Sequence, residues 1–255
     1  MSTLRRLVPA LAVLSAAGLA LTGCESTSGG GSQAGGSDTF TVCTNSPYPP
    51  FEFEKDGKIV GFDMSLGDEI AKDLGREKNV VQANFETLES GAALDTDQCD
   101  AAISGITITD ARKQSVDFSK PYFNDQIALL TTKDSGIRDF DSVGDKTVGV
   151  QQATSGEQFA KDKHLKTQQF EDVELMFQSL ESGGVQAVSG NISTLSKRAK
   201  DNPDLEVVQT VDTNENLGVA VKKGNTEILD SVNKTLDRIT SDGTMDKMKK
   251  EWMGL

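Results

Sequence analysis

Short apolar runs alternate with amphipathic helical segments from Thr39 almost to the end of the chain. The first run spans residues 40–44, and the next segment places Leu66, Ile70 and Leu74 on one helical stripe. Strands that alternate with helices are typical of parallel sheets covered by helices, so the sequence predicts an α/β fold. Further strands are predicted at 80–85, 100–104, 127–132, 146–151, 185–189 and 205–209, and helices at 63–74, 109–115, from 154, at 172–182, at 191–200 and twice at the C-terminus.

The segment 99–123 concentrates groups that bind small anions. An apolar run at 101–103 leads through a Ser-Gly pair to Thr107 and Thr109, where a helix is predicted to begin with Arg112 in its first turn. A helix N-terminus offers unpaired N–H groups, and a guanidinium matches the two oxygens of a carboxylate. The segment predicts a carboxylate receptor, although a simple N-cap threonine and a surface arginine would explain the same residues.

The charge of the chain excludes some partners. Its formal net charge is −13 over 255 residues, with 36% hydrophobic and 25% charged residues. Such acidity argues against nucleic acid and against adhesion to anionic lipid through a basic surface. A solvated, acidic surface on a globular protein is the simplest interpretation.

The N-terminus reads as a targeting segment. Arg5 and Arg6 precede an apolar stretch, 7–21, that is too short to span a bilayer. The tetrad Leu21-Thr22-Gly23-Cys24 resembles the lipobox of bacterial lipoproteins, which implies cleavage before Cys24 and a diacylglyceryl thioether on its sulfur. Stable anchoring needs at least two acyl chains, which this modification supplies. An ordinary signal peptide followed by an incidental cysteine is the alternative.

A Gly- and Ser-rich segment separates this region from the folded body. Residues 24–38 hold almost no apolar side chains and are predicted to be a flexible linker, after a signal peptide at 1–23. The mature protein is therefore expected on the outer face of the cytoplasmic membrane, tethered through its lipid.

Four motifs in a fixed order resemble one family, the polar amino-acid solute-binding proteins of ABC importers. The motifs are YPPFEF at 48–53, GFDMSLGDEIA at 61–71, ISGITITDAR with VDFSKPYF between 103 and 123, and GTMDKMKKEWMG at 243–254. The resemblance implies the two-lobed type II fold of periplasmic binding proteins, each lobe a mostly parallel sheet flanked by helices. It places lobe 1 at 39–125 plus 215–255 and lobe 2 at 126–214, with crossing strands near 123–126 and 213–216.

The resemblance also implies a function. Such a protein captures a small carboxylate, most simply a polar amino acid of the glutamate or glutamine type, between its lobes and delivers it to an ABC permease in the membrane. A monomer is expected, with no cofactor and no metal. Two alternatives stay open: a dehydratase of prephenate-like compounds on the same fold, and a sensory module that reports its ligand to a membrane partner.

Family roles transfer to individual residues. Arg112 should bind the ligand's α-carboxylate with help from Thr107 and from a helix start at Thr154 and Ser155, which could also be a plain N-cap pair. Tyr48 and Phe51 match positions whose rings form a wall against the ligand, beside Gly105, although both rings could simply pack under the Pro-rich turn. The implied ligand-binding residues are thus Tyr48, Phe51, Gly105, Thr107, Arg112, Thr154, Ser155 and Asn191.

Asn191 departs from the family pattern. The family usually ends this segment, here Gln186 to Asn191, with an acidic residue that holds the ligand's α-ammonium. An amide accepts a hydrogen bond but does not neutralise a buried cation, which would cost several kcal/mol to leave unpaired. Either another carboxylate, with Glu86 and Glu215 as candidates, takes over this role, or the ligand lacks a full α-ammonium.

Two cysteines remain besides Cys24. Cys43 and Cys99 could form a disulfide outside the cytoplasm, or they could be two separate buried thiols. An offset of about four residues at roughly 3.3 Å each would exceed the reach of a disulfide if both lie in neighbouring strands with level ends.

Signals for catalysis are few. The only histidine, His164, lies among lysines and is expected at a solvated helix end. The sequence has no CxxC or HxxxH pair for a metal and no Gly-rich phosphate loop. The chain is therefore predicted not to be an enzyme.

Overall fold

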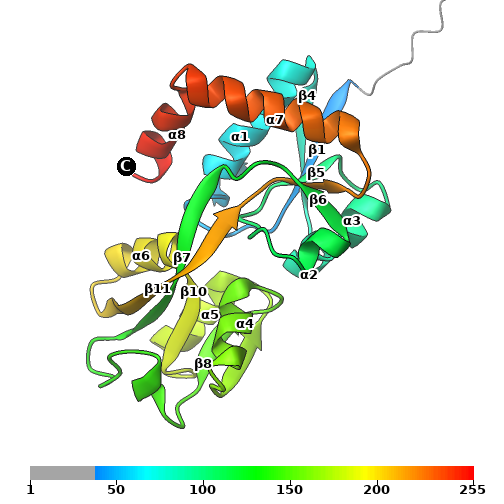
Figure 1. Ribbon diagram of the computed structural model, residues 1–255. Helices are drawn as coiled ribbons and strands as arrows, with labels where there is room; N and C mark the ends of the chain where they lie inside the picture. The colour runs from blue at the N-terminus through cyan, green and yellow to red at the C-terminus, as the bar shows by residue number, and fades with distance from the viewer. Residues whose placement is uncertain (1–37) are drawn as a thin grey trace, which may run out of the picture. The chain divides into compact units, whose positions relative to one another are not determined.

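The computed structural model describes residues 38–255 (Figure 1). The predicted signal peptide, the lipidation at Cys24 and the linker up to residue 37 lie outside the described residues. Within the described part, no helix has the length and apolar character needed to cross a membrane.

The first sheet has five strands in the order β4-β1-β5-β12-β6. Its strand β1 pairs in parallel with β4 and β5, whereas β12 runs antiparallel to both β5 and β6. Because β12 comes from the C-terminal part of the chain, this sheet is completed by a segment that follows the whole second sheet in sequence. The bounds are β1 (Thr39–Thr44), β4 (Glu77–Gln82), β5 (Ala101–Ala102), β6 (Val116–Phe118) and β12 (Ala220–Lys222).

Helices cover both faces of this sheet. The side chains of β1 alternate, so Val42 packs in one apolar cluster and Cys43 in another. The first cluster lies under α1 (Phe62–Leu74), α7 (Thr226–Ser241) and α8 (Thr244–Trp252), and the second under α2 (Phe85–Glu89) and α3 (Ala92–Asp95). We call this part lobe 1. A hairpin of β2 (Phe53–Lys55) and β3 (Lys58–Val60) is added to it.

The second sheet has the order β11-β7-β10-β8-β9. The strands β10, β8 and β9 are parallel, and β7 is antiparallel to both β10 and β11. Parallel pairing thus runs through three strands of each sheet, and antiparallel pairing makes up the rest. The bounds are β7 (Phe123–Thr132), β8 (Val148–Gln151), β9 (Thr167–Phe170), β10 (Ala187–Asn191) and β11 (Leu205–Leu217), with α4 (Ser155–Asp162), α5 (Val173–Glu181) and α6 (Ile192–Asp201) packed on them as lobe 2.

Two long strands cross between the lobes. Figure 1 shows β7 and β11 running together from lobe 2 towards lobe 1. Their pairing continues through Asp125 with Glu215 to Phe123 with Leu217. The predicted crossings at 123–126 and 213–216 fall within these two strands.

Helical periodicity predicted the main helices correctly. In α1, Leu66 and Ile70 are fully buried, and Gly75 ends the helix in the left-handed conformation at φ 66. The stripe of α7, with Val232 and Ile239, is buried in the same cluster. These apolar stripes face the core, as expected.

The predicted helix at 109–115 is wrong. Only a 3-10 turn, η1 (Arg112–Gln114), forms there. The chain before it is held extended, because the N–H of Ile108 donates to the carbonyl of Asn216 at 2.8 Å and Thr107 forms a β-bridge with Leu217. Since β6 already begins at Val116, too few residues remain for a full helix.

Cys43 and Cys99 form a disulfide, with their Cα atoms 5.7 Å apart. The expected offset assumed that Cys99 continues a straight strand. Cys43 is level with Ala102 in the sheet, but the chain before Ala101 turns at residues 96–100 instead of extending. That turn brings Cys99 back beside Cys43.

Candidate functional site

The two lobes meet along a seam of polar contacts that carries most of the predicted binding residues. On the lobe 1 side the contacts come from the end of β1 and the Pro-rich turn at 47–51, from the start of α2, and from the segment between β5 and η1. On the lobe 2 side they come from the end of β8 and the start of α4, from the loop after β9, and from the end of β10. Three contacts across the seam involve predicted binding residues: Tyr48 Oη donates to Asn191 Oδ1 at 2.8 Å, Arg112 Nη2 donates to the carbonyl of Ala153 at 2.7 Å, and the hydroxyls of Thr107 and Ser155 lie 3.4 Å apart. Three more are made by side-chain amides: Gln151 Nε2 donates to Asn45 Oδ1 at 2.8 Å, Gln152 Nε2 to Glu86 Oε2 at 2.9 Å, and Asn84 Nδ2 to Glu171 Oε1 at 3.1 Å.

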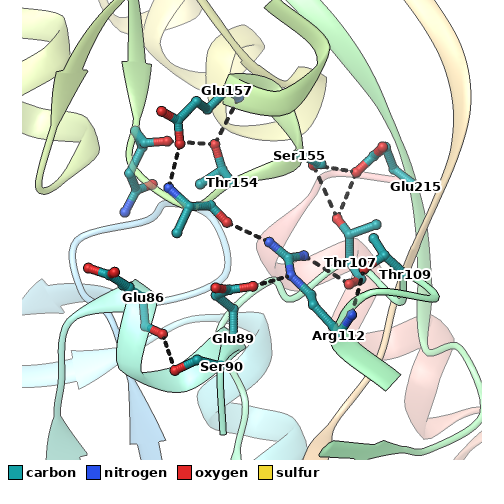
Figure 2. A network of polar contacts seen from close by, with 12 residues as sticks. Glu86, Glu89, Ser90, Thr107, Thr109, Arg112, Thr154, Ser155, Glu157 and Glu215 are labelled. Atoms are coloured by element: carbon teal, nitrogen blue, oxygen red, sulfur yellow. Dashed lines mark hydrogen bonds and ion pairs between the residues drawn. The ribbon is translucent and has the colours of Figure 1, made fainter. Parts of the chain in front are cut away.

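Arg112 lies at the centre of this seam (Figure 2). Its Nε donates to Glu89 at 3.0 Å, Nη1 to the carbonyl of Thr107 at 2.9 Å and Nη2 to the carbonyl of Ala153. The guanidinium also lies 5.4 Å from the centre of the Phe85 ring. A guanidinium has five N–H donors, and these three bonds use one on each nitrogen. One N–H on each terminal nitrogen is therefore left for a further acceptor.

Glu215 gathers two hydroxyls from opposite lobes. Its Oε2 accepts from Thr107 at 2.7 Å and from Ser155 at 2.6 Å (Figure 2). The residue belongs to the crossing strand β11 and is only 4% exposed. The predicted binding hydroxyls are thus held by a carboxylate of the protein itself.

The start of α4 is a reciprocal cap. The hydroxyl of Thr154 accepts from the N–H of Glu157 at 3.2 Å, and Glu157 Oε2 accepts from the N–H of Ala153 at 2.7 Å. Burial by itself would raise the pKa of Glu157, but Lys161 and this N–H outweigh it and lower the pKa. Ala153 has φ 64, and its carbonyl accepts from Arg112.

Tyr48 lines two small cavities, each of about 10 Å³. That volume is about enough for one water molecule. Burial is the main cause that raises the pKa of the Tyr48 phenol, so its hydroxyl stays protonated and donates to Asn191. The two cavities share Tyr48, Gln151, Thr154 and Asn191; the first adds Thr194 among others, and the second adds Phe85, Gly105, Thr107, Arg112 and Ser155.

Several buried polar atoms at these cavities have no hydrogen-bond partner within the described residues. They are Asn191 Nδ2, Gln151 Oε1 and Thr194 Oγ1. Buried polar atoms are normally paired, so such a cluster favours a polar occupant. Of the two carboxylates suggested as substitutes at Asn191, Glu86 is exposed and Glu215 is buried.

Seven of the eight predicted binding residues line these cavities. Phe51 is the exception: it is fully buried and stacks behind Tyr48 with ring centres 5.9 Å apart, so it packs in the core of lobe 1. Thr109 accepts from the N–H of Arg112 at 3.2 Å, which is a local capping role. His164 is exposed, as expected.

The sequence analysis missed some residues of the site. Gln151, Thr194 and Phe85 line the cavities, and Glu89 pairs with Arg112. Gln151 could have been found, because it ends a predicted strand three residues before Thr154. Among the described residues no cluster of three or more His, Cys, Asp or Glu could hold a metal ion.

Comparison with known proteins identifies the family. The model of the bacterial extracellular solute-binding proteins, family 3, matches residues 40–255. The chain belongs to this family. The resemblance of the motifs is thereby confirmed, together with the two-lobed type II fold.

Individual relatives bind amino acids. The arginine-binding extracellular protein ArtP of Bacillus subtilis is 32% identical, over 91% of this chain and 92% of its own. The L-cystine-binding protein TcyJ of Escherichia coli is 30% identical, over 85% and 83%. The crystal structure of AncCDT-1, an ancestral amino acid-binding protein and precursor of cyclohexadienyl dehydratase, superposes with a TM-score of 0.77 at 35% identity, over 85% of this chain and 95% of that one.

Membership of this family supports an extracytoplasmic amino-acid-binding role in transport by an ABC importer. These relatives are named as amino-acid-binding proteins.

Proposed function

We propose that this chain captures a polar amino acid between its lobes and delivers it to an ABC permease. One observation carries the proposal. Arg112 keeps an N–H on each terminal nitrogen and lines a cavity together with Gly105, Thr107 and Ser155, all from the seam between the lobes. This set matches a ligand carboxylate, because the guanidinium keeps two N–H donors there and two hydroxyls, which donate to Glu215 in this structure, line the same cavity.

In the proposed complex, Arg112 binds the α-carboxylate and the hydroxyls of Thr107 and Ser155 assist it. The N–H groups at the start of α4 lie beside them, where a helix end favours negative charge. Tyr48 and Asn191 face the rest of the ligand, and the unpaired atoms of Gln151 and Asn191 bond to its polar groups.

The charges at the seam favour a ligand whose side chain is neutral or cationic. Arg112 is accompanied by several acidic residues, and its own charge is already paired with Glu89. A glutamate ligand would bring a second carboxylate into this environment, whereas glutamine or a basic amino acid would not. The arginine- and cystine-binding relatives agree with this preference. The acidic residues are Glu86, Glu89, Glu171, Glu215 and Asp125.

The proposed mechanism is closure about the crossing strands. Lobe 1 comprises 39–125 with 215–255, and lobe 2 comprises 126–214. A ligand that touches Arg112 on one lobe and Ser155 on the other favours the closed state through contacts that the open state lacks. We further propose that the mature protein acts as a monomer, anchored by lipid at Cys24 on the outer face of the cytoplasmic membrane.

A thermal-shift screen tests the function. The chain without residues 1–23, with Cys24→Ser to keep it soluble, would be melted with arginine, lysine, histidine, cystine, glutamine, glutamate and matching carboxylates that lack the amino group. Saturation at about 100 times the dissociation constant stabilises by roughly 2.7 kcal/mol, which is visible as a shift of the melting temperature. We expect at least one neutral or basic amino acid to raise it; no shift with any amino acid would contradict the proposal.

Arg112→Ala should remove most of the ligand affinity. Removing one partner of a buried charged contact costs about 2–5 kcal/mol, or roughly 30- to 5,000-fold in affinity. Arg138→Ala, at an exposed arginine of lobe 2, is the matched control and should bind normally. Unchanged affinity in Arg112→Ala would remove this residue from the site.

A dehydratase is the second candidate. The structural likeness to a dehydratase precursor favours it, as does Asn191, which leaves the cleft without the family's ammonium-binding carboxylate. Asp125, whose pKa burial raises to about 6, would be the general acid to test. Turnover of prephenate or arogenate that disappears in Asp125→Asn would establish this activity, and its absence would leave the binding role alone.

A further inference from the structure

Two fully buried carboxyl groups meet at the loop that follows β5 in lobe 1, residues 103–107, which we call the binding loop. Glu52 lies just before β2, and Asp63 lies in the first turn of α1. The chain brings them together because the N–H of Asp63 donates to the carbonyl of Phe51 at 3.0 Å, so the two segments run side by side. Both side chains are 0% exposed, and they lie within hydrogen-bonding distance of each other.

Two of their four oxygens are used by the binding loop and its neighbours. Glu52 Oε1 accepts from the hydroxyl of Ser104 at 2.6 Å. Asp63 Oδ2 accepts from the N–H of Gly105 at 2.7 Å and from the hydroxyl of Tyr122 at 3.0 Å. The other two oxygens, Glu52 Oε2 and Asp63 Oδ1, have no donor within the described residues.

One proton accounts for both remaining oxygens. If Glu52 is a neutral acid, its O–H donates to Asp63 Oδ1, and each oxygen of the pair then has a partner. Two ionised carboxylates in contact within a dry interior would instead repel each other and leave two acceptors unpaired. A single shared proton therefore gives both oxygens a partner without placing two charges in contact.

The surroundings decide which residue keeps that proton. Asp63 receives an N–H and a phenolic O–H, which stabilise its charged form, whereas Glu52 has only two hydroxyls near it, those of Ser104 and Thr44. Burial, followed by the nearby Asp63, raises the pKa of Glu52 well above its ordinary value. The titratable side chains that face the pair are the phenols of Tyr122 and Tyr48, and burial raises the pKa of both.

The pair is tied to the site through a turn of two residues. Gly105 has φ +54, and a Cβ there would lie 3.1 Å from the Tyr48 ring, so the ring rests directly on this turn. Ser104, held by Glu52, also accepts from the N–H of Asn45 at 2.9 Å. Any shift of the Ser104–Gly105 turn therefore also shifts the ring of Tyr48 and the residues that lead from the turn to Thr107.

We propose that Glu52 and Asp63 share one proton and act as positioning residues, which fix the Ser104–Gly105 turn so that Tyr48 and Thr107 meet the ligand in the right place. This role rests on the proposed function, because it concerns the same binding site. The neutral acid acts as a hydrogen-bond donor that no carboxylate could replace.

Binding by matched variants tests the role, with L-arginine as the probe. Glu52→Gln keeps a donor towards Asp63 and an acceptor for Ser104, so we expect its dissociation constant within about threefold of the wild type. Glu52→Ala removes both and should raise it by about tenfold or more. Asp63→Asn replaces one acceptor oxygen by an NH₂ group, which would face either the N–H of Gly105 or the proton of Glu52. This variant should therefore also bind more weakly. Glu54→Gln, an exposed change two residues away, is the control.

Two readouts of the proton do not depend on any ligand. At neutral pH the infrared carbonyl band of a protonated carboxylic acid should be present in the wild type and lost in Glu52→Gln. Because the pKa of Glu52 is raised in the folded state, its contribution to the free energy of unfolding should be lost as pH rises from about 4, the ordinary range of a glutamate, towards the folded value. The stability of Glu52→Gln should therefore fall less over this range than that of the wild type.

The outcomes separate this inference from the proposed function. A wild type without the acid band, a Glu52→Gln variant as weak as Glu52→Ala, or a Glu52→Ala variant that binds normally would each overturn the positioning role. If L-arginine and the other amino acids fail to bind while the acid band is present, the proposed function fails but the shared proton stands.

Discussion

Asn191→Asp changes the charge at the site without changing its shape. Asn191 ends β10, is 4% exposed and uses Oδ1 to accept from Tyr48, whereas its Nδ2 has no partner within the described residues. Replacing that Nδ2 by oxygen therefore breaks no described hydrogen bond. It introduces the acidic residue that the resemblance to the family implies at this position.

Asp125 indicates what a carboxylate costs in this environment. It is 2% exposed, accepts from the N–H of Ser193 near the start of α6, and burial raises its pKa to about 6. A shift of roughly two units corresponds to about 3 kcal/mol at 1.36 kcal/mol per unit. Asn191→Asp should then lower the melting temperature near neutral pH by roughly 6–12 °C, at 2–4 °C per kcal/mol for a chain of this size.

The pH dependence of that loss follows from its sign. An aspartate with a raised pKa in the folded state holds its proton more tightly there, so stability falls as pH rises from about 4 through the folded pKa. The variant and the wild type should melt alike below about pH 4, where the new carboxyl is protonated in both states.

An amino-acid ligand should reverse the cost. A hydrogen bond between an α-ammonium and the new carboxylate contributes about 1.5–3 kcal/mol, or roughly 10- to 150-fold in affinity. Calorimetric titration near neutral pH would compare L-arginine with 5-guanidinovalerate, which lacks the amino group. We expect tighter binding of arginine only. Equal effects on both compounds, or weaker binding of arginine, would refute the placement of the ammonium within reach of both position 191 and Glu215.

Two further predictions concern the disulfide and the binding turn. The disulfide joins residues 56 positions apart, so its loss in a Cys43→Ala/Cys99→Ala double variant should lower the free energy of unfolding by about 4 kcal/mol. The melting temperature should fall by roughly 8–16 °C. An unchanged melting temperature would show that the disulfide adds no stability. Gly105→Ala should weaken ligand affinity several-fold, because its Cβ would press on the Tyr48 ring. The control is Gly57→Ala, at a glycine with φ +73 and no atom within 4 Å of the added Cβ. It should cost about 1 kcal/mol of stability without changing affinity.

Local periodicity was sufficient for the elements that bury one face. The stripe of Leu66 and Ile70 predicted α1, and that of Val232 and Ile239 predicted α7, because an apolar residue every third or fourth position marks the buried side of a helix. The hairpin β2–β3 was missed although Asp56-Gly57 between two short runs is a turn signal; both residues have positive φ.

Contacts between distant residues explain the failures. The segment before Arg112 contains good helix signals, but its pairing with residues 216–218, at the end of β11 and just after it, keeps it extended. No local pattern shows that pairing. Similarly, Glu215 reaches Thr107 and Ser155 across separations of 108 and 60 residues. The sequence thus indicated which residues line the site but not how they pair with one another.

These pairings determine what a ligand has to supply. The carbonyls of Thr107 and Ala153 already accept from Arg112, and the hydroxyls of Thr107 and Ser155 already donate to Glu215. A ligand carboxylate that recruits these hydroxyls would approach the Glu215 carboxylate, and two like charges in a buried place repel each other. An amino acid avoids this cost, because its ammonium lies next to its carboxylate and can pair with Glu215. The proposed preference for amino acids over simple carboxylates therefore follows from the position of Glu215, even though position 191 carries no charge.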